Sequence, residues 1–180
     1  VWGTSIEEHD AALKQVLDAA LKNKLKLNPS KCVFGVKELT FLGDKLTSEG
    51  IKPDESKVSA ISNMEMPNDK QGIQRFLGMV TYLAKWIPDF SQKTALLRSL
   101  LLQTSEWQWG YEQEAAWQHL KDILTTEPVL EYFNPSKPIR ISSDASKDGL
   151  GAVLLQLHDA QWKPVSYASQ AMSDAETCYA

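Results

Sequence analysis

The residue best suited to chemistry is Asp144, which lies in the stretch IRISSDASKDGLGAVLLQ. Ile139 and Ile141 alternate with polar residues, the period-2 pattern of a strand with one apolar face, and this parity puts Asp144 on the polar face. Asp148-Gly149 then signals a turn. A carboxylate on a rigid strand beside a hairpin is a good first ligand for a hard cation such as Mg²⁺. The residues alone leave a second interpretation open, an ordinary strand-end or turn aspartate.

A basic segment lies near the N-terminal end of the chain, with no acidic residue between Asp18 and Glu38; its lysines are Lys22, Lys24, Lys26, Lys31 and Lys37. One interpretation is a solvated helix end, where the helix dipole favours positive charge. The other is a patch that binds phosphates in a salt-sensitive way. Both interpretations stay open at this point.

A third candidate is Gly43, which belongs to the strand-like run Leu39–Gly43. A glycine in a strand favours a bulge or a close approach of the backbone to a ligand. Ser48-Glu49-Gly50 supplies a turn before the next strand-like run. The pattern therefore predicts two strands joined by a turn at Ser48-Glu49-Gly50, with Gly43 inside the first strand.

The elements that must position these residues are helical before and after this hairpin. Ser5 opens a capping-box spacing, and Asn28-Pro29 is expected to end the helix that follows. Asp54 and Asp69 are predicted caps of two further helices, in the second of which Gly78 would permit close helix packing. The remaining expectations are helices near 91–102 and 112–126, then antiparallel strands at 139–144, 150–156 and 164–168.

Composition bounds the function classes. The chain has 180 residues, 43% of them hydrophobic, and a formal charge of −4, which argues against a generally basic nucleic-acid binder. Cys32 and Cys178 are far apart and lack metal-ligand spacing, so we expect reduced thiols of an intracellular protein. Two locations, a cytoplasmic particle and the nucleus, both stay open. No apolar run approaches membrane-spanning length, so no membrane partner is expected. The chain starts without Met and stops without a closing element, and we interpret it as a fragment.

The order of the motifs carries a family resemblance. The segments KLNPSKCVFGVKELTFLGDKLTSEGIKPD, QGIQRFLGMVTYLAKWIPDFS, WQWGYEQEAAWQHLKDILTTEPVL, ISSDASKDGLGAVLLQ and PVSYAS follow one another in this sequence. Together they resemble the Pol polyprotein of Ty3/gypsy-type retrotransposons over nearly the whole chain. The resemblance implies an α+β fold: a palm-end hairpin with a helical thumb bundle, followed by a truncated ribonuclease H-like antiparallel sheet.

The resemblance also implies domains and roles. Residues 1–53 would be the end of the reverse transcriptase palm, 54–106 the thumb, 107–138 the connection and 139–180 the start of the ribonuclease H domain. Phe41, Leu42 and Gly43 match the primer grip, the hairpin that holds the primer 3′ end, so bulk at Gly43 would keep the backbone from the sugar-phosphate chain. Lys24, Lys26 and Lys31 would then line the duplex path.

Asp144 matches the first carboxylate of the ribonuclease H site, which uses two Mg²⁺ ions to hydrolyse the RNA strand of RNA–DNA hybrids. Glu176 would belong to the loop before the helix that carries the next catalytic glutamate. The palm aspartates would precede Val1, and the other ribonuclease H carboxylates would lie beyond Ala180, so the chain is expected to be inactive alone. Its expected partners are RNA–DNA hybrid, primer–template duplex and the remainder of the Pol polyprotein.

Two hypotheses follow. The first is a fragment of a reverse transcriptase/ribonuclease H that works only within the full polyprotein. The second is a catalytically dead remnant, retained by a host as a nucleic-acid-binding or interaction module. Under either, the sheet that starts at Ile139 lacks a covering helix, and we expect one of its faces to expose apolar side chains.

Overall fold

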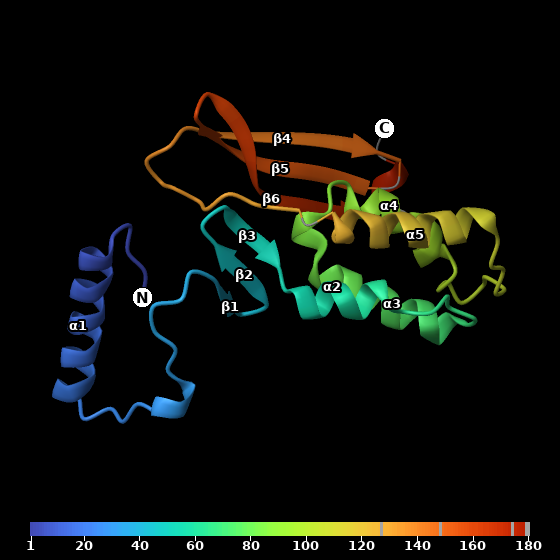
Figure 1. Ribbon diagram of the computed structural model, residues 1–180. Helices are drawn as coiled ribbons and strands as arrows, with labels where there is room; N and C mark the ends of the chain where they lie inside the picture. Colours follow the sequence, from blue (N-terminus) through green and yellow to red (C-terminus); the bar gives the residue numbers. More distant parts are fainter. Residues whose placement is uncertain (127, 148, 174, 179–180) are drawn as a thin grey trace. The chain divides into compact units, whose positions relative to one another are not determined.

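The computed structural model describes residues 1–126, 128–147, 149–173 and 175–178. The chain forms two compact units, Val1–Val36 and Lys37–Ala180. In the described residues, helices combine with two three-stranded antiparallel sheets (Figure 1), so the predicted α+β class is confirmed. The predicted domain bounds after residues 53, 106 and 138 all fall inside the second unit, and they stay a prediction.

The N-terminal unit is built on helix α1 (Ile6–Lys22). The Ser5 hydroxyl accepts a hydrogen bond from the Glu8 amide at 3.2 Å, as predicted, but the Glu8 carboxylate accepts from the Thr4 amide instead of completing the capping box at Ser5. The helix ends at Lys22, six residues before the predicted stop at Asn28. Lys24 has a φ of +56°, and the Leu25 amide donates to the Ala20 carbonyl at 2.9 Å, a Schellman-type end that terminates the helix early.

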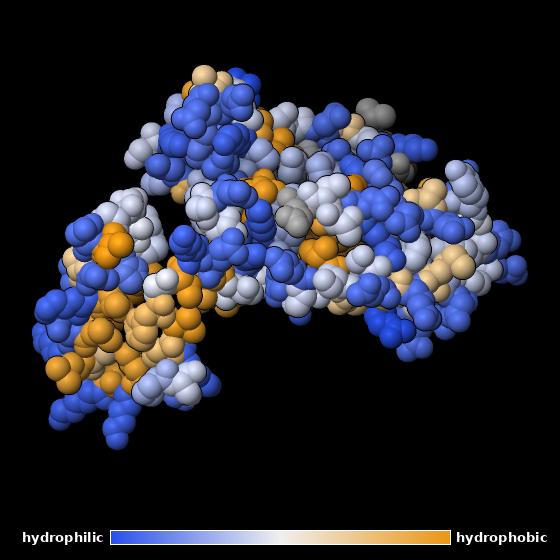
Figure 2. All heavy atoms as spheres, viewed as in Figure 1, coloured by the Kyte–Doolittle hydropathy of each residue, from blue (hydrophilic) through white to orange (hydrophobic). Residues whose placement is uncertain are grey.

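This unit has almost no core of its own. Ala20 is its single buried residue, and apolar side chains gather on the face turned to the viewer in Figure 2. The exposed ones include Val16, Leu17, Leu21, Leu25, Leu27 and Phe34. The 3₁₀ helix η1 (Pro29–Lys31) follows, capped by the Asn28 side chain, which accepts from the Ser30 amide at 3.0 Å. An exposed apolar surface of this kind is typical of a contact region for another polypeptide segment.

The second unit opens with a three-stranded meander of β1 (Leu39–Phe41), β2 (Asp44–Thr47) and β3 (Gly50–Pro53). Leu42 and Gly43 join β1 to β2 with φ angles of +52° and +85°, so both turn residues are left-handed. This is the backbone of the tight hairpin turns that match strand twist. The turn predicted at Ser48-Glu49-Gly50 is confirmed between β2 and β3. The prediction that Gly43 lies inside a strand is wrong, because it lies in the turn between β1 and β2.

A helical bundle follows, made of α2 (Glu55–Ser62), α3 (Lys70–Tyr82), the 3₁₀ helix η2 (Ala84–Trp86), α4 (Phe90–Ser99) and α5 (Tyr111–Thr125). The predicted caps are confirmed: the Asp54 carboxylate accepts from the Ser56 amide at 2.9 Å and the Asp69 carboxylate from the Gly72 amide at 2.6 Å. The core is continuous through these helices and includes Ile61, Ile73, Phe76, Trp86, Leu97, Trp117 and Leu120.

The second sheet has the order β4–β5–β6, with β4 (Ile139–Ser146), β5 (Gly149–His158) and β6 (Gln161–Ala171). The strands are antiparallel, as predicted, and longer than predicted. Asp159 and Ala160 form the β5–β6 turn with φ angles of +48° and +65°. Asp148, half of the other predicted turn, lies outside the described residues.

The two faces of this sheet differ. On one face, α4 contacts β5 and β6, and Tyr167 packs against the helical core. The other face carries Ile139 and Ile141, whose side chains are 56% and 71% exposed. Among the described residues no helix covers it, so the expected exposed apolar face is confirmed.

Candidate functional site

The tip of the β1–β2 hairpin presents apolar side chains to solvent. Phe41 is 57% and Leu42 82% exposed, although burying such side chains is worth about 1.5–3 kcal/mol each. Their exposure at a turn that is held in place favours a contact surface over a packing role.

Gly43 is required by contacts inside the protein. Its φ of +85° disfavours a side chain, and an added Cβ would overlap the Tyr82 hydroxyl oxygen and lie 2.9 Å from Tyr82 Cζ. The Tyr82 hydroxyl donates to the Leu42 carbonyl at 3.0 Å. The close approach at Gly43 is therefore to α3, and this contact accounts for the glycine without a nucleic-acid strand.

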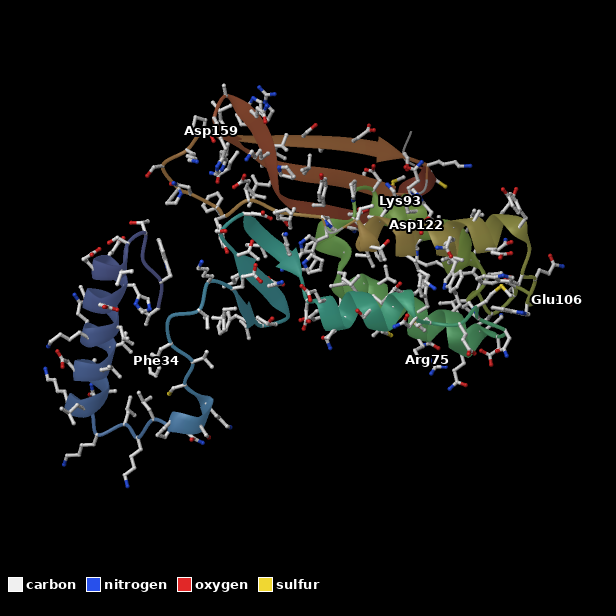
Figure 3. All side chains as sticks on the ribbon, viewed as in Figure 1. Phe34, Arg75, Lys93, Glu106, Asp122 and Asp159 are labelled. Atoms are coloured by element: carbon white, nitrogen blue, oxygen red, sulfur yellow. The ribbon has the colours of Figure 1, made fainter. Side chains whose placement is uncertain are left out.

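The exposed face of α3 continues the surface from the hairpin tip, because Tyr82 belongs to both. Its other exposed positions, spaced at three and four residues, are Gln71, Gln74, Arg75, Gly78 and Thr81. Arg75 points away from the bundle (Figure 3). A Cβ added at Gly78 would meet nothing within 4 Å, so the predicted role of Gly78 in close helix packing is wrong.

Gly78 is therefore unexplained by the protein's own packing. An exposed glycine in a helix interior costs about 1 kcal/mol relative to alanine. It leaves a gap in the side-chain layer between Gln74 and Tyr82, where a ligand can approach the helix backbone. Sequence reasoning missed this face as a site, although a signal was present: its polar residues and Gly78 lie at helical spacing opposite the apolar stripe that is buried in the core.

The predicted phosphate-binding lysines lie in the N-terminal unit. Lys24, Lys26 and Lys31 are exposed, and none of them pairs with a carboxylate within the part of the chain that the structure describes. Lys24 also occupies the left-handed position that ends α1. Phe41, Leu42 and Gly43 belong to the second unit, so each group is a separate feature here.

Asp144 lies exposed on β4, on the same face as Arg140, as its parity predicts. Its Oδ1 accepts a hydrogen bond from the Ala145 amide at 2.9 Å. Gly151 is its partner on β5, and a Cβ added there would lie 2.8 Å from Asp89 Oδ1, at the start of α4. Arg140, four residues before Asp144, stacks its guanidinium 4.1 Å from the Trp162 ring centroid.

A divalent cation needs several oxygen ligands. Among the described residues, no group of three or more histidine, cysteine, aspartate or glutamate side chains is placed to hold a metal ion. Asp144 alone does not fit a two-metal centre, so no reaction step follows from these residues by themselves.

Glu176 has a structural partner. Its Oε2 accepts from the Ser173 amide at 2.7 Å and from the Ser173 hydroxyl at 2.8 Å, and these bonds lower the pKa of the Glu176 carboxyl. The Glu176 amide points back to the Ser173 hydroxyl at 3.4 Å, at the start of the 3₁₀ helix η3 (Glu176–Cys178). This reciprocal pattern is that of a capping box.

Ion pairs hold the base of the hairpin. The Lys45 ammonium bridges Glu55 at 2.6 Å and Glu38 at 2.9 Å, and these hydrogen bonds raise the pKa of Lys45 above its usual value. Lys45 is therefore engaged within the protein, and its charge is compensated before any anionic ligand approaches.

The comparisons with known proteins agree with this architecture. Residues 109–180 match the family described as the RNase H-like domain found in reverse transcriptase. The chain is 36% identical over 165 residues to the retrovirus-related Pol polyprotein from transposon 412 of Drosophila melanogaster, which covers 92% of this chain and 13% of that protein. It is 35% identical over 180 residues to the transposon Tf2-3 polyprotein of Schizosaccharomyces pombe, covering 99% and 14%.

Solved structures share the fold. The foamy viral protease-reverse transcriptase dRH in complex with double-stranded DNA matches with a TM-score of 0.81 at 22% identity, over 98% of this chain and 31% of that one. The same viral protein in complex with an RNA/DNA hybrid matches with a TM-score of 0.78 at 22% identity, over 98% and 24%.

The relatives that this chain resembles in sequence are transposon Pol polyproteins. More closely, the chain is similar to the segment of transposon Pol polyproteins that includes the RNase H-like domain of reverse transcriptase, and it spans 13–14% of the length of those two relatives. The coarser part of the predicted resemblance is thereby confirmed, and the Ty3/gypsy type stays a prediction. Within the described residues, no helix is long and apolar enough to cross a membrane.

Proposed function

We propose that this chain is the template–primer-binding segment of a Ty3/gypsy-type reverse transcriptase/ribonuclease H. In this assignment the palm ends near residue 53, the thumb spans 54–106, the connection 107–138, and the ribonuclease H domain starts at 139. The observation that carries the proposal is the surface formed by the exposed hairpin tip and the outer face of α3, with Gly78 open between polar side chains.

This duplex-binding surface, made of Phe41, Leu42, Tyr82, Gly78 and the polar residues before it on α3, suits a nucleic-acid duplex. The apolar tip packs against sugars, Gln74 offers neutral donors and acceptors, and Arg75 pairs with phosphate. A helix backbone bared at Gly78 approaches the duplex closely. The contacts depend on the shape and the sugar-phosphate backbone of the duplex, so the affinity is independent of base sequence and decreases as the salt concentration rises.

Two further contributions complete the proposal. Lys24, Lys26 and Lys31 contact phosphates, each neutralised phosphate adding about 0.9 to the slope of log affinity against log salt. The exposed apolar surface of the N-terminal unit packs against the remainder of the Pol polyprotein.

Asp144 supplies one carboxylate ligand for Mg²⁺ in the complete enzyme, and the other ligands come from residues outside this chain. Mg²⁺ held there would supply water activation and stabilisation of the leaving oxygen in hydrolysis of the RNA strand. The Ala145 amide donates to Asp144 Oδ1, which orients the carboxylate and would leave Oδ2 available as a ligand.

The decisive test is Gly78→Ala, because folding and binding respond with opposite signs. Since nothing lies within 4 Å of the added Cβ, the substitution stabilises the fold by about 1 kcal/mol. It should weaken binding of a fluorescent primer–template duplex, because the methyl group holds the backbone away. A larger change, Gly78→Glu, should abolish binding. Ala115→Glu adds the same charge on the exposed face of α5 and is the control, which should keep binding.

A more stable Gly78→Ala protein with unchanged duplex affinity would show that the duplex does not contact this surface. The in-frame flanking coding sequence separates the enzyme from a retained remnant: an upstream Tyr-x-Asp-Asp with downstream glutamate and aspartate favours the enzyme, and stop codons there favour the remnant.

A further inference from the structure

We infer that Lys85 and Asp44 are positioning residues that lock the β1–β2 hairpin to the helical bundle, so that the hairpin tip and α3 bind a duplex as one rigid surface. The inference rests on the proposed function for its role in binding. The contact itself is independent of any ligand, because it joins two elements of the same unit.

A short ion pair joins the hairpin to the helical bundle. Lys85 Nζ lies 2.5 Å from Asp44 Oδ2, 41 positions away in sequence. Asp44 is the first residue after the turn, so the ion pair holds the hairpin directly beneath its exposed tip. The side chain of Asp44 is 22% exposed and that of Lys85 39%, so both charges are partly shielded from water.

Neighbouring contacts align with this ion pair. Lys85 Nζ lies 4.3 Å from the centroid of the Trp86 ring, and Trp86 is buried in the core. The Tyr82 hydroxyl holds the Leu42 carbonyl on the other side of the turn. The tip is therefore attached at Leu42 and at Asp44, through side chains that lie three residues apart near the end of α3.

An electrostatic role and a positioning role of Asp44 predict changes of opposite sign in duplex affinity. Asp44 is an acidic residue close to a surface proposed to bind a polyanion, so simple electrostatics predicts that its removal strengthens binding. A positioning role predicts the reverse, since releasing the hairpin spreads Phe41 and Leu42 over many orientations and adds an ordering cost to binding. The sign of the change separates the two.

The experiment uses three variants of the 180-residue chain. Two are the single variants Asp44→Asn and Lys85→Met, and the third is a double variant that exchanges the charges, Asp44→Lys together with Lys85→Asp. The readouts are affinity for a primer–template duplex over a range of salt, and amide hydrogen exchange of residues 41–45 without nucleic acid. Each single variant should weaken binding and accelerate exchange about threefold, the factor expected for a partly exposed ion pair. The exchanged pair should regain both. Lys85 is neutralised internally, so Lys85→Met should leave the salt slope unchanged.

Asp18→Asn is the matched control, because it breaks the Lys14–Asp18 pair at 2.7 Å and removes the same charge far from the hairpin in sequence. It should leave affinity unchanged or raise it. Unchanged or stronger binding by Asp44→Asn, with exchange unaltered, overturns the positioning role. Loss of binding in Gly78→Glu together with unaltered Asp44→Asn binding overturns the positioning role alone. A wild-type chain that binds no duplex overturns the proposed function and the positioning role in binding with it.

Discussion

Replacing Gly43 with alanine tests how the hairpin is held to α3. The φ of +85° disfavours any side chain in the folded state by about 1–2 kcal/mol. Alanine offsets about 0.4–1 kcal/mol of this cost, because it leaves the unfolded chain less conformational freedom than glycine does. The new Cβ also displaces the Tyr82 ring, which removes the hydrogen bond to the Leu42 carbonyl, worth about 0.5–1.5 kcal/mol. The expected loss in the free energy of unfolding is about 2 kcal/mol.

The assay is denaturant unfolding followed by circular dichroism, with a double-mutant cycle against Tyr82→Ala. In the Tyr82→Ala protein the steric overlap is gone, so Gly43→Ala should cost only the backbone part, about 0.5–1 kcal/mol. Leu42→Gly serves as the control in the same turn, because it relaxes a φ of +52° without touching Tyr82 and should be neutral or stabilising. An equal cost of Gly43→Ala with and without the Tyr82 ring would refute the reasoning.

Further predictions concern the other turn, a cap and the proposed metal ligand. Ala160→Gly should stabilise the chain by up to about 1 kcal/mol in thermal unfolding, because alanine holds a φ of +65° there; destabilisation would count against the strain. Hydrogen bonds from the Ser56 hydroxyl and amide lower the pKa of Asp54, so its contribution is present above about pH 4 and is lost as the pH falls through the folded-state pKa. Asp54→Ala should thus cost about 1 kcal/mol near neutral pH and progressively less in acid, and a pH-independent cost would contradict the cap. In a protein extended through the whole ribonuclease H domain, Asp144→Asn should abolish RNA-strand hydrolysis of hybrids, polymerisation should largely survive, and the capping residue variant Glu176→Gln should keep most hydrolysis. In the present chain Mg²⁺ should stabilise the fold by less than about 0.5 kcal/mol, and a strong rise in Tm would place the metal site on other residues.

A matched test of the basic segment uses Lys24→Ala with Lys26→Ala. If these lysines neutralise phosphates, the double variant should lower the salt slope of duplex binding by about 0.9 for each phosphate that is no longer neutralised. An unchanged slope, measured in the same titration as the wild-type chain, would leave the lysines with the solvated helix-end role that the sequence also allows.

The sequence by itself determined the elements whose signals are local. Asp54 and Asp69 cap helices because each carboxylate reaches amides only two or three residues ahead, and the alternation at Ile139 and Ile141 puts Asp144 on the opposite face of its strand. The prediction for the end of α1 was wrong, because a lysine in the left-handed conformation at residue 24 terminates the helix where no glycine or proline marks the stop.

Only the tertiary structure decided what Gly43, Gly78 and Lys85 do. Tyr82 meets Leu42 across 40 positions and Lys85 meets Asp44 across 41, and no periodicity or spacing encodes such pairs. Helical periodicity places Gly78 opposite the apolar stripe of α3, but only the packing of the elements decides that no neighbour covers that face. Local hydrogen bonds are fixed by residues within one turn, whereas a contact between a hairpin and a helix exists only after the core has set their distance and orientation.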